Sequence, residues 1–221
     1  MRDSAKKIKI FCDFDGTVTI GDVGDFFFST FTRQQSLDAV ELWEAGKIDS
    51  REMYLRTVDL LQLTPQEYEN FLDQQQLDPY FPMFVQQCQQ FNIPVTILSD
   101  GLDFYINPLL ARHGLAHLQV YANEMHWNGH GKFEIKFPFY DHTCGYCANC
   151  KGYQLRRLRQ PDDMMVFIGD GLSDLCGVKE ADLVLAKDVL ASYCDQKKIT
   201  YIPYQNFADL LTWLKDNYWH S

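Results

Sequence analysis

A buried strand that runs directly into two closely spaced carboxylates is the feature that most constrains this chain. Residues 8–12 are mostly apolar, which is typical of a parallel strand with both faces covered. Asp13 and Asp15 follow directly. Gly16 then lets the backbone turn, and Thr17 can hydrogen-bond to the loop that leaves the strand. Ionised groups at such a position need a cation or strong hydrogen-bond donors. Since open α/β sheets bind ligands beyond the carboxyl ends of their strands, this stretch predicts a functional site.

The size and charge of the chain narrow the class of protein. Its 221 residues are 46% hydrophobic, which suits one main domain, or a domain with a modest insertion. The formal net charge of -10 argues against nonspecific binding to nucleic acid, so a phosphate ligand would need a metal and a few local cations. No apolar run approaches the roughly 20 residues that span a bilayer, and residues 1–11 carry no signal-peptide core. We therefore expect a cytoplasmic protein without a membrane partner; the oligomeric state stays open.

The segment after the first strand changes to helical spacing. Apolar residues recur at helical intervals from about residue 20 to about residue 78. Within it, Thr64 and Glu67 form a capping box, with Pro65 at the first helical position. We interpret residues 20–78 as a helical cap domain inserted into a core domain of residues 1–19 and 79–221.

The remainder of the chain alternates apolar runs with helical segments. This alternation predicts an α/β fold built on a Rossmann-like, doubly wound parallel sheet. Residues 118–137 indicate a β-hairpin whose turn is expected at residues 128–131, and residues 207–218 indicate a final helix. The other strands expected after the first are residues 94–98, 163–168, 183–186 and 199–202.

The loops that follow these strands carry the residue types that phosphoryl transfer requires. Asp13 is suited to attack phosphorus and form an aspartyl-phosphate, and Asp15 to protonate the leaving oxygen and later accept a proton from water. Ser99, the amide of Gly101 and Lys151 would neutralise the oxygens of the transferred group. Because the carboxyl ends of the strands in a doubly wound sheet converge on one crevice, these separate segments can meet there.

Carboxylates from two of these loops also predict a metal site. Asp13, Asp170, Asp174 and the backbone carbonyl of Asp15 would together supply oxygen ligands. Oxygen ligands that are completed by water to an octahedron favour Mg²⁺. We therefore expect Mg²⁺ as a cofactor of the phosphoryl chemistry.

Three cysteines immediately before Lys151 form a second cluster of potential metal ligands. Cys144, Cys147 and Cys150 stand at two successive C-x-x-C spacings, and His142 precedes them. Three thiolates and one imidazole would satisfy the tetrahedral preference of Zn²⁺, although four ligands within nine residues strain that geometry. A compact loop with reduced thiols or one labile disulfide is the alternative. The other cysteines in apolar runs, which we expect in the core, are Cys12, Cys88 and Cys176.

Four motifs together resemble those of the haloacid dehalogenase superfamily. They are the segment from Asp13 to Thr17, the Ser99 loop, Lys151 and the segment from Gly169 to Asp174, and they frame nearly the whole chain in the family's order. The second aspartate resembles the phosphatase and mutase branches, and the helical insert resembles the type-1 cap of the phosphoserine phosphatase branch. The resemblance implies phosphate or substrate binding by Asp22, Gly16, Thr17, Ser99, Asp100, Gly101 and Lys151.

A narrower resemblance is to the bacterial phosphatases of methionine salvage. It rests on residues 98–104, on the cysteine cluster before Lys151 and on residues 202–207. It implies a small phosphate monoester as the substrate. Asp22 and Asp25, with Phe26 or Phe27, are candidates to face that substrate. Helix capping is the simpler role of Asp22, and core packing is that of the phenylalanines.

Other functions remain compatible with these motifs. A phosphoserine-type phosphatase and a phosphotransferase or mutase would use the same four loops. A catalytically silent scaffold that binds zinc or responds to redox state belongs to a different class. The presence of Asp13, Asp15, Ser99, Lys151 and Asp170 argues against silence, because a decayed site would have lost some of them.

Overall fold

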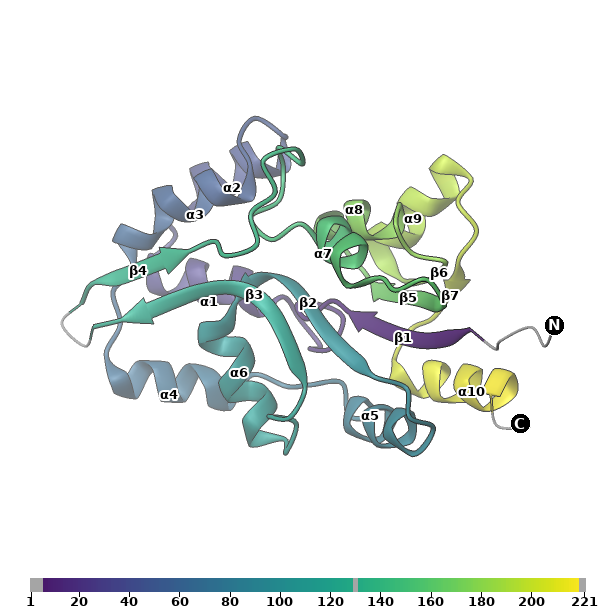
Figure 1. Cartoon of the computed structure of the whole chain (residues 1–221). Helices are drawn as coiled ribbons and strands as arrows, with labels where there is room; N and C mark the ends of the chain where they lie inside the picture. Colours follow the sequence, from purple (N-terminus) through teal and green to yellow (C-terminus); the bar gives the residue numbers. More distant parts are fainter. Residues whose placement is uncertain (1–5, 129–130, 219–221) are drawn as a thin grey trace.

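The computed structural model describes residues 6–128 and 131–218. Its central element is one mixed β-sheet. Within these residues seven strands follow the order β4-β3-β2-β1-β5-β6-β7 (Figure 1). Neighbouring strands are parallel, except that β3 and β4 form an antiparallel pair. The strands are β1 (Lys7–Cys12), β2 (Val95–Leu102), β3 (Gln119–Trp127), β4 (Phe133–Lys136), β5 (Asp163–Gly169), β6 (Leu183–Ala186) and β7 (Ile202–Pro203).

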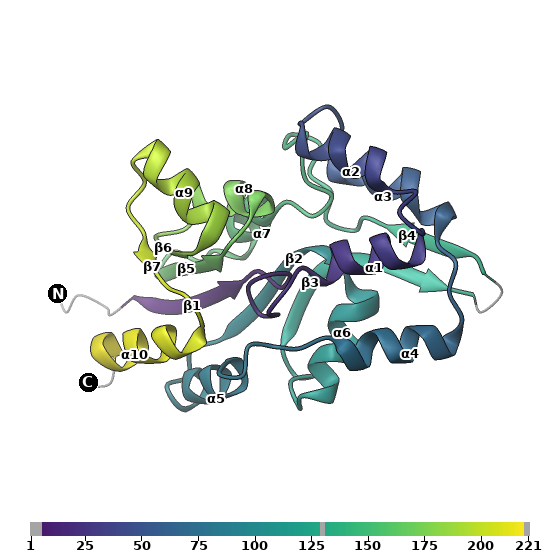
Figure 2. The same cartoon turned by 180° about the vertical axis from the view of Figure 1, so that it is seen from behind.

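Helices cover both faces of this sheet, as a doubly wound fold requires. In Figures 1 and 2, α7, α8 and α9 lie on one face, and α5 and α10 lie on the other. The helices are α1 (Val23–Phe31), α2 (Leu37–Glu44), α3 (Ser50–Thr57), α4 (Pro65–Gln74), α5 (Phe81–Gln90), α6 (Asp103–Arg112), α7 (Lys151–Leu158), α8 (Leu175–Val178), α9 (Asp188–Lys197) and α10 (Phe207–Tyr218). Short 3₁₀ turns occupy Val58–Leu60 and Leu172–Asp174.

Alternate residues of the central strand pack into different apolar clusters. Ile10 and Cys12 of β1 belong to the larger cluster, which includes residues of α5 and α10. Phe11 between them belongs to a second cluster with residues of α7, α8 and α9. Because successive side chains of a strand point to opposite faces, a strand that is apolar at consecutive positions fits only between two covered faces.

The central strand also marks the point at which the strand order changes direction. From β1 the chain builds β2 and β3 on one side, and it later adds β5, β6 and β7 on the other. Ligands of open α/β sheets bind beyond the carboxyl ends of the strands at such a point. Asp13 and Asp15, which follow β1 directly, therefore stand at the usual binding position of this architecture.

Helices α1 to α4 form an insertion whose two ends lie next to each other beside the sheet. Thr19 and Leu77 make an isolated antiparallel bridge, and the N–H of Asp78 donates to the carbonyl of Val18 at 2.8 Å. In Figure 1, α2 and α3 lie beyond the carboxyl end of β1, while α4 lies beside α6. The capping box expected at Thr64 is present at the start of α4.

The fold class expected from the sequence is confirmed, with two local differences. β2 does not stop before Ser99 but continues to Leu102 with an irregular register, because the buried polar groups of this segment find hydrogen-bond partners. The sequence interpretation missed α9, in which only Leu190 and Cys194 are fully buried. The hairpin of β3 and β4 is present, and residues 129–130 of its expected turn lie outside the described residues.

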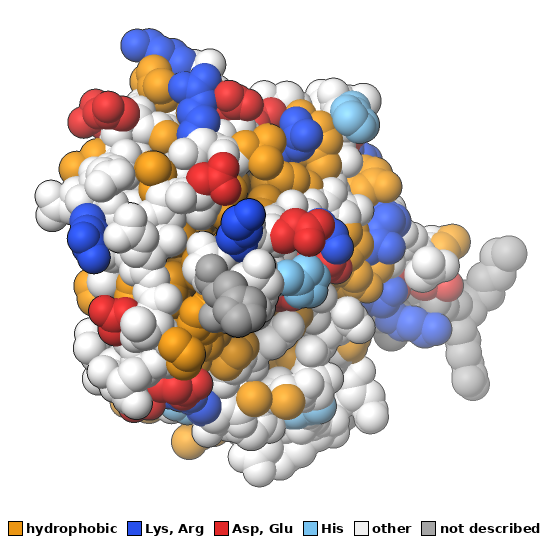
Figure 3. Space-filling model, turned by 90° about the vertical axis from the view of Figure 1, so that its left-hand side faces the viewer, with side chains coloured by type: hydrophobic (Ala, Val, Ile, Leu, Met, Phe, Trp, Pro, Cys, Tyr) orange, Lys and Arg blue, Asp and Glu red, His pale blue; other side chains and the backbone are white. Residues whose placement is uncertain are grey.

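The surface mixes charged and apolar side chains. On the face in Figure 3, acidic and basic side chains of the described residues are interspersed with uncharged ones. Several large apolar side chains in and before the inserted helices are exposed: Ile20, Phe26, Leu37 and Leu55. None of the helices in the described part of the chain is long and apolar enough to cross a bilayer.

We expect Phe207→Ala to lower the free energy of unfolding by about 3–5 kcal/mol. Phe207 is fully buried and joins α10 to α5, with its ring centroid 4.8 Å from that of Phe81 and 5.1 Å from that of Phe84. Met83→Ala in α5 is the control, because Met83 is 51% exposed, and should change stability by less than about 1 kcal/mol. Urea unfolding of both variants measures the difference; equal effects would contradict this account of the core.

Candidate active site

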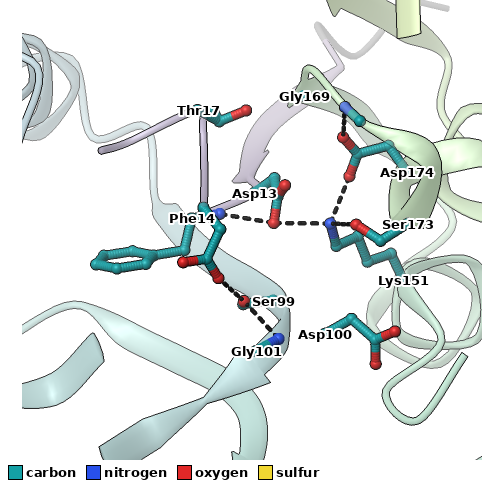
Figure 4. Close-up of polar contacts among 12 residues, drawn as sticks. Asp13, Phe14, Thr17, Ser99, Asp100, Gly101, Lys151, Gly169, Ser173 and Asp174 are labelled. Carbon is teal, nitrogen blue, oxygen red and sulfur yellow. Dashed lines mark hydrogen bonds and ion pairs between the residues drawn. The ribbon is translucent and has the colours of Figure 1, made fainter. Parts of the chain in front are cut away.

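Asp13 lies at the carboxyl end of β1 and is almost fully buried. Its Oδ1 accepts from the backbone N–H of Phe14 at 2.7 Å and pairs with the Nζ of Lys151 at 2.7 Å (Figure 4). Burial raises the pKa of the Asp13 carboxyl well above its ordinary value, and the Asp174 carboxylate raises it further, while Lys151 opposes both effects. The carboxylate is thus held in one position, next to the single ammonium that counters it.

Lys151 is the first residue of α7, and its side chain is completely buried. Besides Asp13, its Nζ contacts Asp174 Oδ1 at 2.5 Å and donates to Ser173 Oγ at 2.8 Å. Burial alone would lower the pKa of Lys151, but the two carboxylates outweigh it and raise the pKa, so the ammonium stays protonated. A charged lysine therefore lies between the loop after β1 and the loop after β5, as Figure 4 shows.

The loop after β5 is organised by Asp174. Its Oδ2 accepts from the backbone N–H groups of Asp170 and Gly171, both at 2.9 Å. Asp170 in turn accepts from the hydroxyl of Thr17 at 2.5 Å. Gly16, next to Thr17, has φ +75°, and a side chain there would collide with the Asp170 carboxylate, so glycine is required on two grounds.

Asp15 is held by donors from three other segments. Its Oδ2 accepts from the hydroxyl of Tyr105 at 3.0 Å and lies 3.4 Å from Ser99 Oγ. Its Oδ1 accepts from the backbone N–H groups of Val23 and Gly24 at the start of α1, both at 3.2 Å. Burial, followed by the negative charge of a neighbouring aspartate, raises the pKa of Asp15 to about 7. A carboxyl with this pKa can both donate and accept a proton near neutral pH.

The polar end of β2 is fixed by hydrogen bonds on each side. The N–H of Gly101 donates to Ser99 Oγ at 2.9 Å, and the N–H of Asn149 donates to the Asp100 carboxylate at 2.6 Å. The side-chain amide of Asn149 donates to the Ser99 carbonyl at 2.8 Å, and the hydroxyl of Tyr54 donates to the Asp100 carbonyl at 2.9 Å. Burial raises the pKa of the Asp100 carboxyl to about 6. Asp100 thus links β2 to the loop before α7.

A pocket opens above these groups, between the sheet and the inserted helices. Its floor includes the carboxylates of Asp13, Asp15 and Asp170. Its upper wall is mostly apolar, with small polar residues between: Phe28, Ser36, Val40, Trp43, Ser50, Met53, Tyr54 and Thr57. Among the described residues that line this pocket, none is lysine or arginine. The pocket can therefore hold an uncharged group above the carboxylates.

The residues expected to face a substrate lie at the start of α1, and they make different contacts. Asp22 accepts from the N–H of Asp25 at 2.7 Å as the cap of α1, and both residues also line the pocket. Phe27 is buried in the core, and Phe26 stacks on Phe71 at 5.7 Å between ring centroids, outside this pocket. Asp22 therefore caps α1 and Phe27 packs in the core. Of these four residues, only Asp22 and Asp25 line the pocket.

The carboxylates at the centre of the site fit a divalent cation. Oxygen atoms of Asp13, Asp170 and Asp174 lie within 4.8 Å of one another. Burial and the charge of Asp174 raise the pKa of Asp170 to about 6, so its ionised form is disfavoured at this position. A hard cation with oxygen ligands would offset that negative charge, and Mg²⁺ meets this donor set.

The cysteine cluster contains a different fourth residue from the one expected. Cys144, Cys147 and Cys150 meet Cys176 of α8, whereas the ring of His142 packs edge-on against Tyr140. His142 was expected as a ligand, but its ring atoms are not among the clustered ligand atoms, because the ring packs against Tyr140 instead. Cys176 was expected in the core, but its position in α8 brings it to the loop; Cys12, Cys88 and Cys194 are buried core residues.

Sequence reasoning missed several residues that hold the site together. Tyr105 contacts Asp15, Tyr54 contacts Asp100, Ser173 contacts Lys151, and Asn149 ties β2 to the loop before α7. Only Asn149 and Ser173 had a local signal, since they adjoin the recognised motifs. Tyr54 and Tyr105 lie in helical segments, where an aromatic residue predicts core packing equally well.

Comparison with known proteins agrees with the fold and with the class of enzyme. The model of the haloacid dehalogenase-like hydrolase family matches residues 10–179, and the chain belongs to this family. Two proteins named 2-hydroxy-3-keto-5-methylthiopentenyl-1-phosphate phosphatase, from Bacillus cereus strain B4264 and Bacillus mycoides strain KBAB4, are 31% and 33% identical to it. Each alignment spans 217 residues and covers 94% of this chain and 96% of the relative. Within the family, the chain is a phosphatase, a hydrolase of phosphoric monoesters.

Solved structures share the same fold over nearly the whole chain. A phosphoserine phosphatase from T. onnurineus is 18% identical, with a TM-score of 0.70 and 98% of each chain covered. A HAD-family hydrolase from Salmonella enterica serovar Typhi is 20% identical, with a TM-score of 0.73, and the match covers 98% of this chain and 74% of the other. At these identities the similarity establishes the architecture alone.

We expect the protein without Mg²⁺ to lose stability as the pH rises from about 5 to about 8. The raised pKa values of Asp15, at about 7, and Asp170, at about 6, mean that the folded state retains protons which the unfolded state releases near pH 3.9. The free energy of unfolding therefore falls with rising pH over this window. Urea unfolding in Mg²⁺-free buffer measures it, and Mg²⁺ should restore stability at pH 8. Greater stability at pH 8 than at pH 5 in Mg²⁺-free buffer would contradict the prediction, and Asp170→Asn should flatten the dependence.

Proposed function

We propose that this phosphatase hydrolyses a small phosphate monoester with a short, uncharged and partly apolar tail. The two Bacillus relatives are named for 2-hydroxy-3-keto-5-methylthiopentenyl-1-phosphate, and we propose this compound or a close analogue as the substrate. The observation that carries the proposal is the apolar upper wall of the pocket above Asp13. A thioether chain of this size would contact Phe28, Trp43 and Met53 while its phosphate reached the carboxylates below.

Phosphoserine is a poorer fit to the same pocket. Its carboxylate would need a cation, and the described lining offers no lysine or arginine for it. Asp22 and Asp25 line the pocket and would repel that carboxylate, although either could receive the amine. An unpaired charge that is removed from water costs several kcal/mol, about enough to prevent useful binding.

In the proposed first step, an oxygen of Asp13 attacks phosphorus. The hydrogen bonds that fix this carboxylate are made by Oδ1, and we assign Oδ2 to the attack. A bond forms between Oδ2 and phosphorus, and the bond from phosphorus to the ester oxygen breaks. Asp15, protonated at this stage, gives its proton to the departing oxygen, which leaves as an alcohol.

In the second step water completes the hydrolysis. Asp15, now ionised, takes a proton from a water molecule, and the water oxygen bonds to phosphorus. The bond from phosphorus to Asp13 breaks, which releases inorganic phosphate and regenerates the carboxylate. The raised pKa of Asp15, about 7, suits both directions of this proton transfer. Tyr105 and the first turn of α1 hold Asp15 for the task.

The transferred group would be held by the two remaining loops. We propose that Lys151 and Ser99 contact the phosphoryl oxygens, together with the backbone amide of Gly101. That amide now donates to Ser99 Oγ, so the substrate would compete for a donor that already lies at the site. Gly16, Thr17 and Asp100 would act through the shape and position of the loops.

Mg²⁺ would be held by Asp13, Asp170 and the carbonyl of Asp15, with Asp174 within reach. When bound, it would supply charge that offsets the phosphate oxygens and the surrounding carboxylates. Both oxygens of Asp174 already accept hydrogen bonds, from Lys151 and from the loop amides. We therefore assign to Asp174 mainly the positioning of Lys151 and of the Asp170 loop.

We propose that the chain divides into a core of residues 1–19 and 79–221 and a cap of residues 20–78. The shared exit and return at Thr19 and Leu77 support this division, since such a base lets the inserted helices act as a unit. The cap supplies most of the apolar pocket wall, and the core supplies the reacting groups. A cytoplasmic location remains part of this proposal.

Measurement of kcat/KM over a panel of phosphorylated metabolites tests the substrate. We expect the methylthiopentenyl phosphate to exceed phosphoserine by at least about 100-fold, because the pocket has no partner for a carboxylate. Met53→Lys should shift the preference towards phosphoserine. Leu55→Lys, on an exposed position of the same helix, is the matched control and should leave the ratio unchanged. Preference of the wild-type protein for phosphoserine would refute the proposed substrate.

The two aspartates are expected to give different kinetic losses. Asp13→Asn should lower kcat by at least roughly 1000-fold on every substrate, because it removes the nucleophile. Asp15→Asn should lower kcat/KM, which reports the step that expels the leaving group, roughly 100-fold or more on an alkyl phosphate but much less on p-nitrophenyl phosphate, whose leaving group needs no proton. Thermal unfolding checks that both variants fold. Equal losses of Asp15→Asn on the two substrates would remove Asp15 from the acid role.

A further inference from the structure

Four cysteine thiols meet beside the phosphoryl site. Cys144, Cys147 and Cys150 come from the loop before α7, and Cys176 comes from α8. Their Sγ atoms all lie within 4.8 Å of one another, and those of Cys144 and Cys176 are 3.7 Å apart. Each of the four is a free cysteine. Two separate segments thus contribute to one cluster of sulfur atoms.

The spacing of these sulfur atoms matches a tetrahedral metal site. With zinc–sulfur bonds of about 2.3 Å, two ligands at the corners of a tetrahedron lie about 3.8 Å apart. The Cys144–Cys176 separation of 3.7 Å has this value, and it is far longer than the roughly 2 Å of a disulfide bond. Four thiolates with no place for water form a closed site of the structural kind, and their softness selects zinc over Mg²⁺.

We propose that Cys144, Cys147, Cys150 and Cys176 bind one zinc ion, and that this ion fixes the position of Lys151. The second half of the proposal rests on the phosphoryl-binding role assigned to Lys151 above. The zinc site itself is independent of that role.

The placement of the ligands along the chain explains the effect on Lys151. Cys150 directly precedes Lys151 and caps α7, where its sulfur accepts from the N–H of Tyr153 at 3.5 Å. Cys176 follows Asp174, the partner of Lys151, by two residues. One ion would therefore clamp the two segments that supply the two halves of this ion pair.

Helices α7 and α8 pack directly against each other, with no room for a side chain at Gly152. A side chain at Gly152 would collide with the backbone of Cys176, so these two helices meet without an intervening side chain. This close packing of α7 against α8 is compatible with a site in which sulfur atoms from both segments bind the same ion. Only glycine at this position permits it.

The same loop supports the wall of the pocket. Tyr146, between two of the cysteines, stacks on Trp43 of α2 with 6.1 Å between ring centroids. Its carbonyl accepts from the N–H of Ser50 at the start of α3 at 2.8 Å. Both partners line the pocket. An ion that orders this loop would thus also order one side of the substrate site.

Metal analysis of the purified full chain tests the site. We expect about one zinc per chain after gel filtration in zinc-free buffer. Replacement by Co²⁺ should give the absorption of a thiolate-bound tetrahedral ion. Cys176→Ser should lose most of the zinc. His142→Ala and Cys194→Ala are the matched controls, a histidine close to the loop and a cysteine in the core, and both should retain it.

The effect on Lys151 needs a kinetic readout that simple destabilisation would not give. Cys176→Ser should raise KM for p-nitrophenyl phosphate about tenfold, with a smaller change in kcat. In the Lys151→Ala background the same substitution should add little, because the lysine that zinc would place is then absent. Fully additive effects would show that the ion does not act through Lys151, even if it binds.

Several outcomes would overturn the zinc site. One is wild-type protein with reduced thiols that binds neither Zn²⁺ nor Co²⁺ at a 1:1 ratio. Another is loss of zinc in His142→Ala with retention in Cys176→Ser. Disulfides among these cysteines in place of metal would point to the redox alternative. Absent phosphatase activity with intact zinc binding would refute the proposed function and leave the zinc site standing.

Discussion

The buried ion pair of Lys151 with Asp13 and Asp174 is the interaction on which the rest of the structure depends. Its three charged side chains are almost completely removed from water, which costs several kcal/mol for each ion unless they neutralise one another. The pair joins the loop after β1, the start of α7 and the loop after β5. Because these loops leave different strands, the sheet must be correctly assembled before the lysine can be neutralised.

One lysine does not balance the acidic groups around it. Asp15 and Asp170 have pKa values raised to about 7 and about 6, chiefly by burial. Protonation of these carboxyls is therefore favoured where no cation is bound, and a divalent cation would offset their negative charge. In the proposed mechanism this cation and Lys151 would also offset the charge of a bound phosphate. The excess of carboxylates would thus favour binding of a metal together with a phosphate ester.

The proposed chemistry and the proposed selectivity involve different parts of the fold. The groups proposed to react lie at the ends of β1, β2 and β5, where hydrogen bonds to neighbouring backbone fix them. The apolar wall comes mainly from α1, α2 and α3, which are inserted after β1. The loop of residues 140–150 connects the two regions, because it leads directly into Lys151 and because its Tyr146 stacks on Trp43. A change in this loop would accordingly affect phosphate binding and the substrate pocket together.

The sequence alone determined the sheet, the inserted helices and the roles available to Asp13, Asp15 and Lys151, because strand periodicity and motif order are local properties of the chain. Only the tertiary structure decided which distant groups complete the site. Tyr105 reaches Asp15, Asn149 joins β2 to α7, and Cys176 takes the place expected for His142 in the thiol cluster. These contacts depend on how α6, α7 and α8 pack against the sheet. That packing arises from many weak interactions between distant residues, and no spacing along the chain encodes it.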